Sequence, residues 1–417
     1  MSVLPKNFLT HSIASHPRRD SITRILAAAI NSADAGHAVK KFLTHNPLPA
    51  AQRTFAFGLG KAAPAMTSAL ADLTRLHDSL VITKHASGLH GTAGQVIAGN
   101  HPIPGADSLA AGRAARTFLA QLTPEDLLVC LISGGGSALM AEPLIPLEEL
   151  QALTATLLAS GANIQQINTV RRHLDSLKGG GIVQAANGAR ILSLIVSDVV
   201  GNSLEAIASG PTAPDPTTRD DAKNIAGRDL PFRETPKPGD PLFERVENHI
   251  IASNSNALEA AKRQAEAEGF TCEVIETKLQ GEACEAGPCL AETLKATTRK
   301  IARPFCLLAG GETTVTVRGA GRGGRNQELA LGAVETLRGR DNLMLIALAT
   351  DGEDGPTDAA GAVVSGATAA RAERLAMTSP AFLSANDAYG YFDRLGDLLR
   401  PGPSGTNVND LVFLFSI

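Results

Sequence analysis

The part of the sequence best suited to hold an anion is the glycine-rich stretch Ser133-Gly134-Gly135-Gly136-Ser137, which directly follows the apolar run Leu127–Ile132. Three successive glycines allow a sharp turn or a close backbone approach to a ligand, and the serines add hydroxyl groups where a helix would begin. A nest of backbone N–H groups before a helix suits a phosphate or a carboxylate. The alternative, a tight turn without a ligand, stays open from these residues alone.

A lysine stands at the start of an earlier predicted helix. The short strand Thr54–Phe57 is followed by the turn Gly58-Leu59-Gly60, then by Lys61 and a helix through Leu73. A positive charge in the first helical turn opposes the helix macrodipole, and a bound anion would remove that conflict. The sequence therefore favours a functional Lys61 over a solvated surface lysine.

A second basic stretch lies in the C-terminal half of the chain. Residues 318–327 combine four glycines with Arg318, Arg322 and Arg325, ahead of a helix expected from about Glu328 to Leu337. Arginines on a glycine-rich loop that opens a helix are suited to bind phosphate oxygens bidentately. A third basic group, which includes Lys178, precedes another glycine cluster. It is interpreted either as a solvated helix face or as an anion-facing group.

Carboxylates follow two predicted strands. The strand Leu343–Ala349 leads into a loop with four of them, at positions 351, 353, 354 and 358, and Asp198 follows the strand Ile191–Val196. Four carboxylates held together would be costly without a cation or strong solvation, and the spacing does not fit an EF-hand. We expect Mg²⁺ to be held by Asp351 together with nucleotide phosphates. Asp198 is the candidate that orients or deprotonates a hydroxyl group.

The elements that position these residues alternate between strands and helices, which predicts an α/β fold with a parallel sheet. A helix is expected from about Ser21 to Thr44, and a hairpin partner at Val315–Val317. Prolines concentrate between residues 209 and 241, so we place a domain boundary near residue 240. The expected domains are residues 1–240, with a Rossmann-like parallel sheet, and residues 241–417.

Composition narrows the class of protein. The chain has 417 residues, a net charge of -4, no tryptophan and only 4% aromatic residues, which argues against a nucleic-acid-binding protein. Its five cysteines form no CxxC pair, which favours reduced thiols over a disulfide framework or a zinc site. No apolar run approaches membrane-spanning length and the first residues lack a signal-peptide core. The expected protein is cytoplasmic, without a membrane or nucleic-acid partner.

Taken together, these motifs resemble the glycerate 2-kinase family, also called class II glycerate kinases or the MOFRL family. The resemblance covers nearly the whole chain in one order. Its motifs are Gly60-Lys-Ala-Ala63, Ser133-Gly-Gly-Gly-Ser-Ala-Leu139, Lys178-Gly-Gly180, Ser197-Asp198, Ser209-Gly-Pro-Thr212, Gly310-Gly-Glu-Thr313, Gly324-Arg-Asn-Gln-Glu328, Thr350-Asp-Gly352, Asp354-Gly-Pro-Thr357 and Gly405-Thr-Asn-Val408.

The resemblance implies phosphorylation of the 2-hydroxyl group of D-glycerate by ATP and Mg²⁺, which gives 2-phosphoglycerate and ADP. It implies two α/β domains with the active site in the cleft between them, and it places the family's proposed active-site lysine and arginine on Lys61 and Arg325. Further substrate-binding candidates on the matching motifs are Lys178, Glu312, Arg322, Asn326, Thr406 and Asn407. A homodimer stays open.

This sequence departs from the family pattern at Asn202, Ala388, Asp175 and Ser404. The first departure puts a second metal carboxylate near Asp198 in doubt, because an acidic residue commonly stands there. The other three lie at the periphery of the expected chemistry.

Two other functions are consistent with parts of the sequence. The family has carried a hydroxypyruvate reductase label, and Gly58-x-Gly60-x-x-Ala63 mimics an NAD(P)-binding fingerprint. That fingerprint requires an acidic residue about 20 residues further on, at the end of the second strand. Here the second strand ends in Lys84. The other alternative is a non-catalytic protein that binds a small anion, which would not need the carboxylates beside the basic loop.

Overall fold

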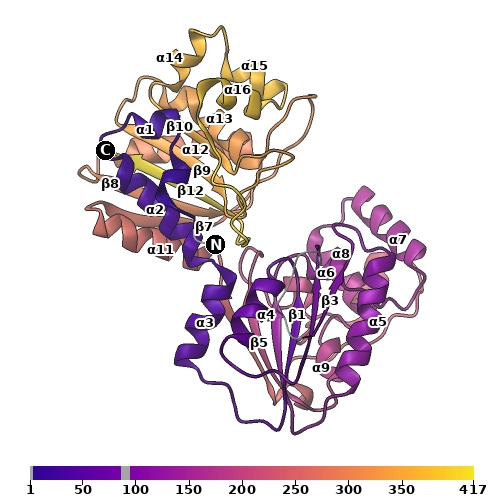
Figure 1. Cartoon of the computed structure of the whole chain (residues 1–417). Coiled ribbons are helices and arrows are strands. Elements are labelled where there is room, and N and C mark those ends of the chain that lie inside the picture. The colour runs from indigo at the N-terminus through magenta and orange to yellow at the C-terminus, as the bar shows by residue number, and fades with distance from the viewer. Residues whose placement is uncertain (1–2, 86–93) are drawn as a thin grey trace. The chain divides into compact units, whose positions relative to one another are not determined.

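The computed structural model describes residues 3–85 and 94–417, and its contacts divide the chain into two compact units (Figure 1). Unit 1 comprises residues 1–34 and 252–417, and unit 2 comprises residues 35–251. These ranges differ from the expected domains 1–240 and 241–417, because the N-terminal segment packs with the C-terminal part of the chain. No helix in the described ranges is long and apolar enough to span a membrane.

Unit 2 contains a six-stranded sheet with the strand order β3-β2-β1-β4-β5-β6. The neighbouring pairs among β1 to β5 are all parallel. The sequences of β1, β4 and β5 are mainly apolar. These strands are almost wholly buried, as expected for a parallel sheet covered on both faces. The strands are β1 (Thr54–Leu59), β2 (Asp78–Thr83), β3 (Gln95–Ala98), β4 (Leu127–Ile132), β5 (Arg190–Val196) and β6 (Val246–Ala252).

This strand order is that of a Rossmann fold, as predicted. In such a sheet the direction of winding reverses between β1 and β4, and ligands bind beyond the carboxyl ends of the strands at that point. The helices of unit 2 are α3 (Ala35–His45), α4 (Ala63–Ala71), α5 (Ala106–Ala120), α6 (Gly136–Leu139), α7 (Leu147–Ala159), α8 (Ile164–His173), α9 (Gly181–Ala185) and α10 (Arg219–Ala226).

Unit 1 contains a mixed six-stranded sheet with the order β11-β10-β9-β12-β8-β7. β12 pairs antiparallel with both β8 and β9, so its first residues lie at the edge where those two strands end. The strands are β7 (Thr271–Leu279), β8 (Phe305–Gly311), β9 (Leu343–Ala349), β10 (Gly361–Ser365), β11 (Leu398–Leu399) and β12 (Asp410–Ser416). Residues 315–317 form no strand, so the predicted hairpin partner is wrong.

The helices of unit 1 pack on that sheet around a separate apolar core. α13 begins at Arg325, three residues before the predicted start. The helices are α1 (His11–Ala14), α2 (Arg19–Ser32), α11 (Asn254–Ala267), α12 (Ala283–Thr297), α13 (Arg325–Leu337), α14 (Thr368–Glu373), α15 (Ser379–Ser384) and α16 (Ala388–Leu395).

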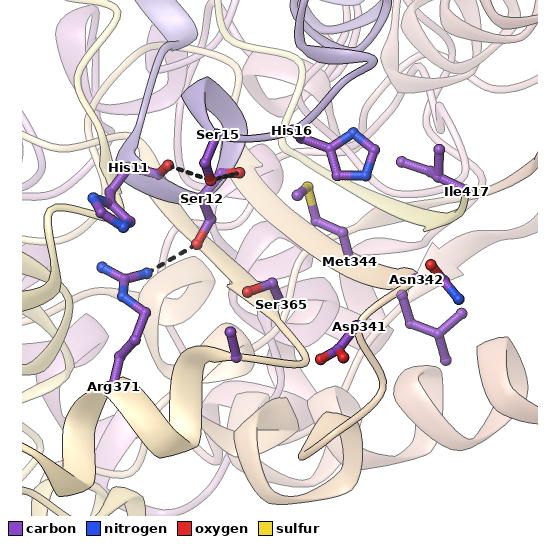
Figure 2. A pocket seen from close by; sticks show the side chains of 12 residues that line it. His11, Ser12, Ser15, His16, Asp341, Asn342, Met344, Ser365, Arg371 and Ile417 are labelled. Carbon is purple, nitrogen blue, oxygen red and sulfur yellow. Dashed lines mark hydrogen bonds between the residues drawn. The ribbon is translucent and has the colours of Figure 1, made fainter.

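The N-terminal segment is held in unit 1 by polar contacts. Ser12 donates its hydroxyl hydrogen to the buried carboxylate of Asp397 over 2.9 Å, and Arg371 donates to both residues (Figure 2). α2 lies beside α11, where Arg24 forms a bidentate ion pair with Glu268. These contacts explain why residues 1–34 belong to unit 1.

The single helix predicted from Ser21 to Thr44 is wrong. The chain forms α2 and α3 instead, with a break at Ala33 and Asp34, where it passes from one unit to the other. The carbonyl oxygen of Ala33, which would continue the helical hydrogen bonds, accepts from the Thr406 hydroxyl over 2.5 Å. A contact with the other end of the sequence therefore supports this break.

Candidate active site

Two loops interlock at the point in unit 2 where the winding reverses. The backbone N–H of Lys61, after β1, donates to the Gly134 carbonyl over 3.0 Å, and the Ala62 N–H donates to Oγ of Ser133 over 3.0 Å. Gly60 has a φ of +122°, and a Cβ there would lie 2.3 Å from the Ser133 carbonyl oxygen. The predicted lysine turn and the glycine-serine loop are thus brought together as one structure.

Gly135 leaves bare backbone beside two basic side chains. Its φ of +88° is in the left-handed region, and a Cβ there would lie 3.2 Å from Cδ2 of His101 and 3.5 Å from Cγ of Lys61. Ser137, two residues later, shares a hydrogen bond with the buried hydroxyl of Ser209 over 2.8 Å. The loop therefore combines a sterically required glycine with fixed hydroxyl groups, as a site for a small anion needs.

The charge around this loop is positive. Lys61 and Lys84 are exposed at the ends of β1 and β2, and His101 follows β3. Burial lowers the pKa of His101, and the charges of Lys61 and Lys84 lower it further. The imidazole is therefore neutral at pH 7 and is able to donate or accept a hydrogen bond, while the lysines supply the charge.

Asp198 lies at the same edge of the sheet, just after β5 and Ser197. A Cβ on Gly134 would lie 2.0 Å from its Oδ2 atom, so only glycine at position 134 accommodates this carboxylate. At the third glycine of the loop, Gly136, a Cβ would lie 2.7 Å from Cβ of Ala208. The first and third glycines thus permit close packing, and the middle one leaves the backbone bare.

In unit 1, Arg325 is anchored by two carboxylates. Its Nε and Nη2 atoms donate to Asp410 over 2.5 and 3.2 Å, and Nη1 donates to Glu312 over 2.6 Å. Burial alone would lower the pKa of Arg325, but Asp410 and Glu312 raise it, so the guanidinium keeps its charge. These bonds use three of the five N–H donors of an arginine, which leaves two for a ligand.

The N-terminus of α13 is closed by a side chain from the acidic loop. Asp354 accepts from the backbone N–H groups of Asn326 and Gln327 over 3.1 and 2.9 Å, and also from the Asn326 amide. Burial raises the pKa of Asp354 to about 6, although these hydrogen bonds act to lower it. Asn326 is thus bound to Asp354 rather than placed to contact a phosphate.

The four carboxylates of the acidic loop are spread apart. Asp354 caps α13, Asp358 bonds to Tyr389 and Arg400, and Glu353 is exposed. Asp351 is half-buried, and its Oδ1 accepts from the Glu353 N–H over 3.1 Å. The expected close cluster of four carboxylates is wrong, because Asp354 and Asp358 have separate partners and Glu353 is exposed to solvent.

The residues described here contain one group of three candidate metal ligands, formed by Glu282, Cys284 and Glu328. A thiol is a poor ligand for Mg²⁺, which prefers oxygen. Asp351 is not in that group, but Mg²⁺ is commonly bound by only one or two protein carboxylates beside substrate phosphates, so Asp351 remains a candidate. Asp198 is the second carboxylate that fits this description.

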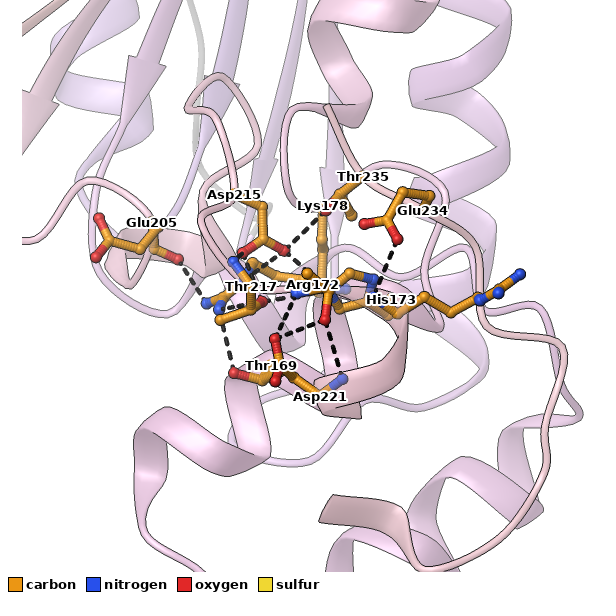
Figure 3. A network of polar contacts seen from close by, with 12 residues as sticks. Thr169, Arg172, His173, Lys178, Glu205, Asp215, Thr217, Asp221, Glu234 and Thr235 are labelled. Carbon is orange, nitrogen blue, oxygen red and sulfur yellow. Dashed lines mark hydrogen bonds and ion pairs between the residues drawn. The ribbon is translucent and has the colours of Figure 1, made fainter. Parts of the chain in front are cut away.

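Lys178 lies away from the bare backbone of the glycine-serine loop. It is 3% exposed, and its Nζ donates to Asp175 over 2.6 Å and to the Met140 carbonyl over 3.0 Å. Its neighbour Arg172 forms a buried ion pair with Asp215 (Figure 3). Lys178 and Arg172 are therefore neither on a solvated helix face nor facing an anion, because internal carboxylates neutralise them.

Three other predicted binding residues have internal partners. The Thr406 hydroxyl donates to Ala33, and the Asn407 side chain accepts from the Asn409 N–H over 3.0 Å. The Arg322 guanidinium lies 4.4 Å from the centre of the Tyr389 ring. Thr406 is buried, Asn407 is half-buried and Arg322 is exposed.

Sequence reasoning missed Asp410, although this residue anchors Arg325 and is 4% exposed. Burial raises its pKa to about 7, while Arg325 acts in the opposite direction. The predicted site residues follow strands, whereas Asp410 is the first residue of the strand β12. Because β12 is antiparallel to β8 and β9, its first residue lies at the same edge as their ends.

Two family models match separate parts of the chain. Residues 21–237 match a domain of unknown function, DUF4147, and residues 305–410 match the MOFRL family. The D-glycerate 2-kinase of Thermotoga maritima is 38% identical over 407 residues, which span 93% of this chain and 96% of that protein. The glycerate 2-kinase of Pyrococcus horikoshii is 39% identical over 86% of each chain.

A solved structure agrees with these matches. The crystal structure of the glycerate kinase from Thermotoga maritima superposes with a TM-score of 0.87 at 37% identity, covering 94% of this chain and 98% of that one. Identity at this level over nearly the full length of both chains establishes descent as well as fold. The chain therefore belongs to the glycerate 2-kinase family.

Proposed function

We propose that this protein transfers the γ-phosphoryl group of ATP to the 2-hydroxyl group of D-glycerate, giving 2-phosphoglycerate and ADP. The observation that carries the proposal is the bare backbone at Gly135 beside Lys61 and His101, in a chain that matches a D-glycerate 2-kinase over 93% of its length. Glycerate carries a carboxylate and ATP carries phosphates, so both substrates suit a positively charged edge.

Phosphoryl transfer requires alignment and charge stabilisation more than covalent help from the protein. We assign charge stabilisation to Lys61 and to the two remaining N–H donors of Arg325. Asp198 orients the 2-hydroxyl group or accepts its proton, and the loop Ser133–Ser137 binds an anionic group of a substrate. Asp351, together with phosphate oxygens, would hold Mg²⁺, and the ion would supply positive charge to the nucleotide phosphates.

A hydroxypyruvate reductase is the second candidate, and its support is the dinucleotide-like turn after β1 and a relative from Agrobacterium vitis named as a putative hydroxypyruvate reductase. An NAD site uses an acidic residue at the end of β2 to bind the ribose 2′-hydroxyl group, whereas here the exposed Lys84 follows β2. A positive charge at that place does not supply the hydrogen-bond acceptor that this contact needs.

The test is to incubate the protein with ATP, Mg²⁺ and D-glycerate and to identify the product by phosphorus NMR. We expect 2-phosphoglycerate and an equal amount of ADP. A 3-phospho product, or no ADP, would contradict the proposal. Oxidation of NADH or NADPH by hydroxypyruvate in a parallel assay would instead identify a reductase.

A further inference from the structure

A polar hollow of about 570 Å³ lies in unit 1 where β8 and β9 begin, at the opposite edge of the sheet from Arg325. The end of α12, the turn before β8 and the turn between α13 and β9 form its walls. Its charged lining residues are Glu292, Lys295, Arg299, Arg303, Arg340 and Asp341. Four cationic side chains thus face two carboxylates.

Most of this positive charge is not neutralised by the protein. Lys295 pairs with Glu292 over 2.8 Å, which leaves three arginines and one aspartate. Within the described residues, the side chains of Arg299 and Arg340 have no hydrogen bond or ion pair. Arg338, close by in sequence, bonds instead to Glu335 and Glu373. Carboxylates are therefore available on this part of the surface, but they do not serve the arginines of the hollow.

The structural alternative is that the arginines neutralise the C-terminal ends of α12 and α13, where cations are favourable. The carbonyl groups at those ends have other partners. The Thr298 hydroxyl donates to the Lys295 carbonyl over 2.7 Å, and the backbone N–H of Arg340 donates to the Leu337 carbonyl over 2.9 Å. Among the described contacts, neither Arg299 nor Arg340 caps a helix through its guanidinium group.

The hollow is also held in shape before any ligand arrives. Nε of Arg303 donates to the Ser416 hydroxyl over 3.0 Å, which orients that guanidinium. The Gly339 N–H bonds to the Gly366 carbonyl over 2.9 Å, and a Cβ on Gly366 would lie 2.3 Å from the carbonyl carbon of Arg340. The held guanidinium of Arg303 loses less entropy on binding an anion than a mobile one would.

We propose that this hollow is a second ligand site, which binds a compact anion with two or more phosphate groups. Bidentate contacts from guanidinium groups match phosphate oxygens. No aromatic side chain lines the hollow, so a nucleotide base would find no stacking surface. The smaller hollow beside it shares Asp341 with this site, but there Ser12 and Arg371 bond to each other (Figure 2).

The test is calorimetric titration of inorganic pyrophosphate into the full chain without divalent metal. The double variant Arg299→Gln/Arg340→Gln is compared with the control Lys300→Gln/Arg374→Gln, which removes the same charge from exposed residues outside the hollow. We expect the hollow variant to bind roughly tenfold more weakly, or not at all, because each arginine donates charge-assisted hydrogen bonds. The control and the unmodified chain should bind equally.

Any pyrophosphate bound at the candidate active site contributes equally to all three titrations, so it cancels in the comparison. In the unmodified chain, higher salt should weaken the pyrophosphate binding that depends on Arg299 and Arg340, because the site is exposed. ADP serves as a second probe, and the ADP binding that the hollow variant loses should be no tighter than the pyrophosphate binding that it loses, because the hollow has no aromatic side chain to contact the base. Equal affinity and stoichiometry in all three proteins, or no binding to the unmodified chain, would overturn the proposal. Circular dichroism and thermal unfolding check that the variants fold.

Discussion

At the residue scale, the charge of Arg325 is controlled by a carboxylate far away in the sequence. Asp410 receives two of its hydrogen bonds and Glu312 receives one, and the side chain of Arg325 remains 32% exposed. An arginine held in this way keeps a fixed orientation while part of it stays available. Asp410, as much as Arg325 itself, should therefore determine the rate of catalysis.

Asp410→Asn should lower kcat by about tenfold or more with a smaller change in KM, because hydrogen bonds between charged groups contribute about 1.5–3 kcal/mol. The matched variant Glu312→Gln removes one contact and should have a smaller effect. Steady-state kinetics for both variants, with thermal unfolding as the folding check, measure the difference. An unchanged kcat in folded Asp410→Asn would show that the anchor has no catalytic role.

A second prediction at this scale concerns Asp351. Its Oδ1 accepts from the Glu353 N–H, a contact that an asparagine would also make. Asp351→Asn should therefore keep the turn, yet raise the Mg²⁺ concentration needed for half-maximal activity, because the substituted amide has lost the charge that attracts the ion. Asp358→Asn is the control, since Asp358 bonds to Tyr389 and Arg400.

Activity in both proteins should vanish with a chelator and return with Mg²⁺. If the midpoint of the Mg²⁺ titration is the same for Asp351→Asn and for the unmodified chain, Asp351 is only a turn residue. Asp198 would then be the next carboxylate to test.

At the element scale, the loop after β4 works because one position lacks a side chain. Gly135→Ala and Gly161→Ala both place an alanine at positive φ, at +88° and +80°, and carry a similar conformational cost of about 1 kcal/mol. Only the first introduces a Cβ beside His101, since nothing lies within 4 Å of a Cβ at position 161.

We expect Gly135→Ala to reduce kcat/KM by about 10²-fold, since a small misplacement of a bound substrate has effects of this size. Gly161→Ala should leave kcat/KM unchanged. Equal losses in thermal stability would show that the conformational costs match. If both variants kept full activity, the loop would be a turn without a ligand.

The N-terminus of α13 provides another prediction at this scale. Asp354→Ala removes the acceptor for two backbone N–H groups at the start of the helix that carries Arg325. Loss of such a cap typically costs about 0.5–2 kcal/mol of unfolding free energy. Glu353→Ala, at an exposed neighbour, should cost less than about 0.5 kcal/mol. Denaturant unfolding of both variants measures this, and equal midpoints would contradict the capping role.

At the scale of the whole molecule, the two proposed charge-stabilising residues belong to different units. Lys61 lies in unit 2 and Arg325 in unit 1. If both act on the same transferring phosphoryl group, their contributions to the transition state should be coupled. Residues that act as one catalytic group give strongly non-additive losses when they are removed together.

Lys61→Ala and Arg325→Ala should each lower turnover by about 10²-fold. The double variant should lose far less than the product of the two single effects. Combining Lys61→Ala with Arg338→Ala, which removes an exposed surface ion pair, should give simple additivity. Additive losses for Lys61 and Arg325 would mean that the two residues serve separate steps.

The sequence by itself determined the buried apolar strands, the glycine-rich turns that follow β1 and β4, and the presence of a Rossmann-like sheet. Buried parallel strands read as continuous apolar runs, and their carboxyl ends must lie at one edge, so Lys61 and Ser133–Ser137 were predictable as neighbours. Glycines at close backbone contacts are likewise recognisable locally, because only they accept positive φ without strain.

Only the tertiary structure decided which charged groups face outward. Lys178 donates hydrogen bonds to Asp175 and to the Met140 carbonyl, and Asp354 of the acidic loop caps α13. Arg325 finds its anchor 85 residues away, and Thr406 finds its partner 373 residues away. Local patterns determine how the backbone turns, whereas the partner of a polar side chain depends on which distant segments the fold brings beside it.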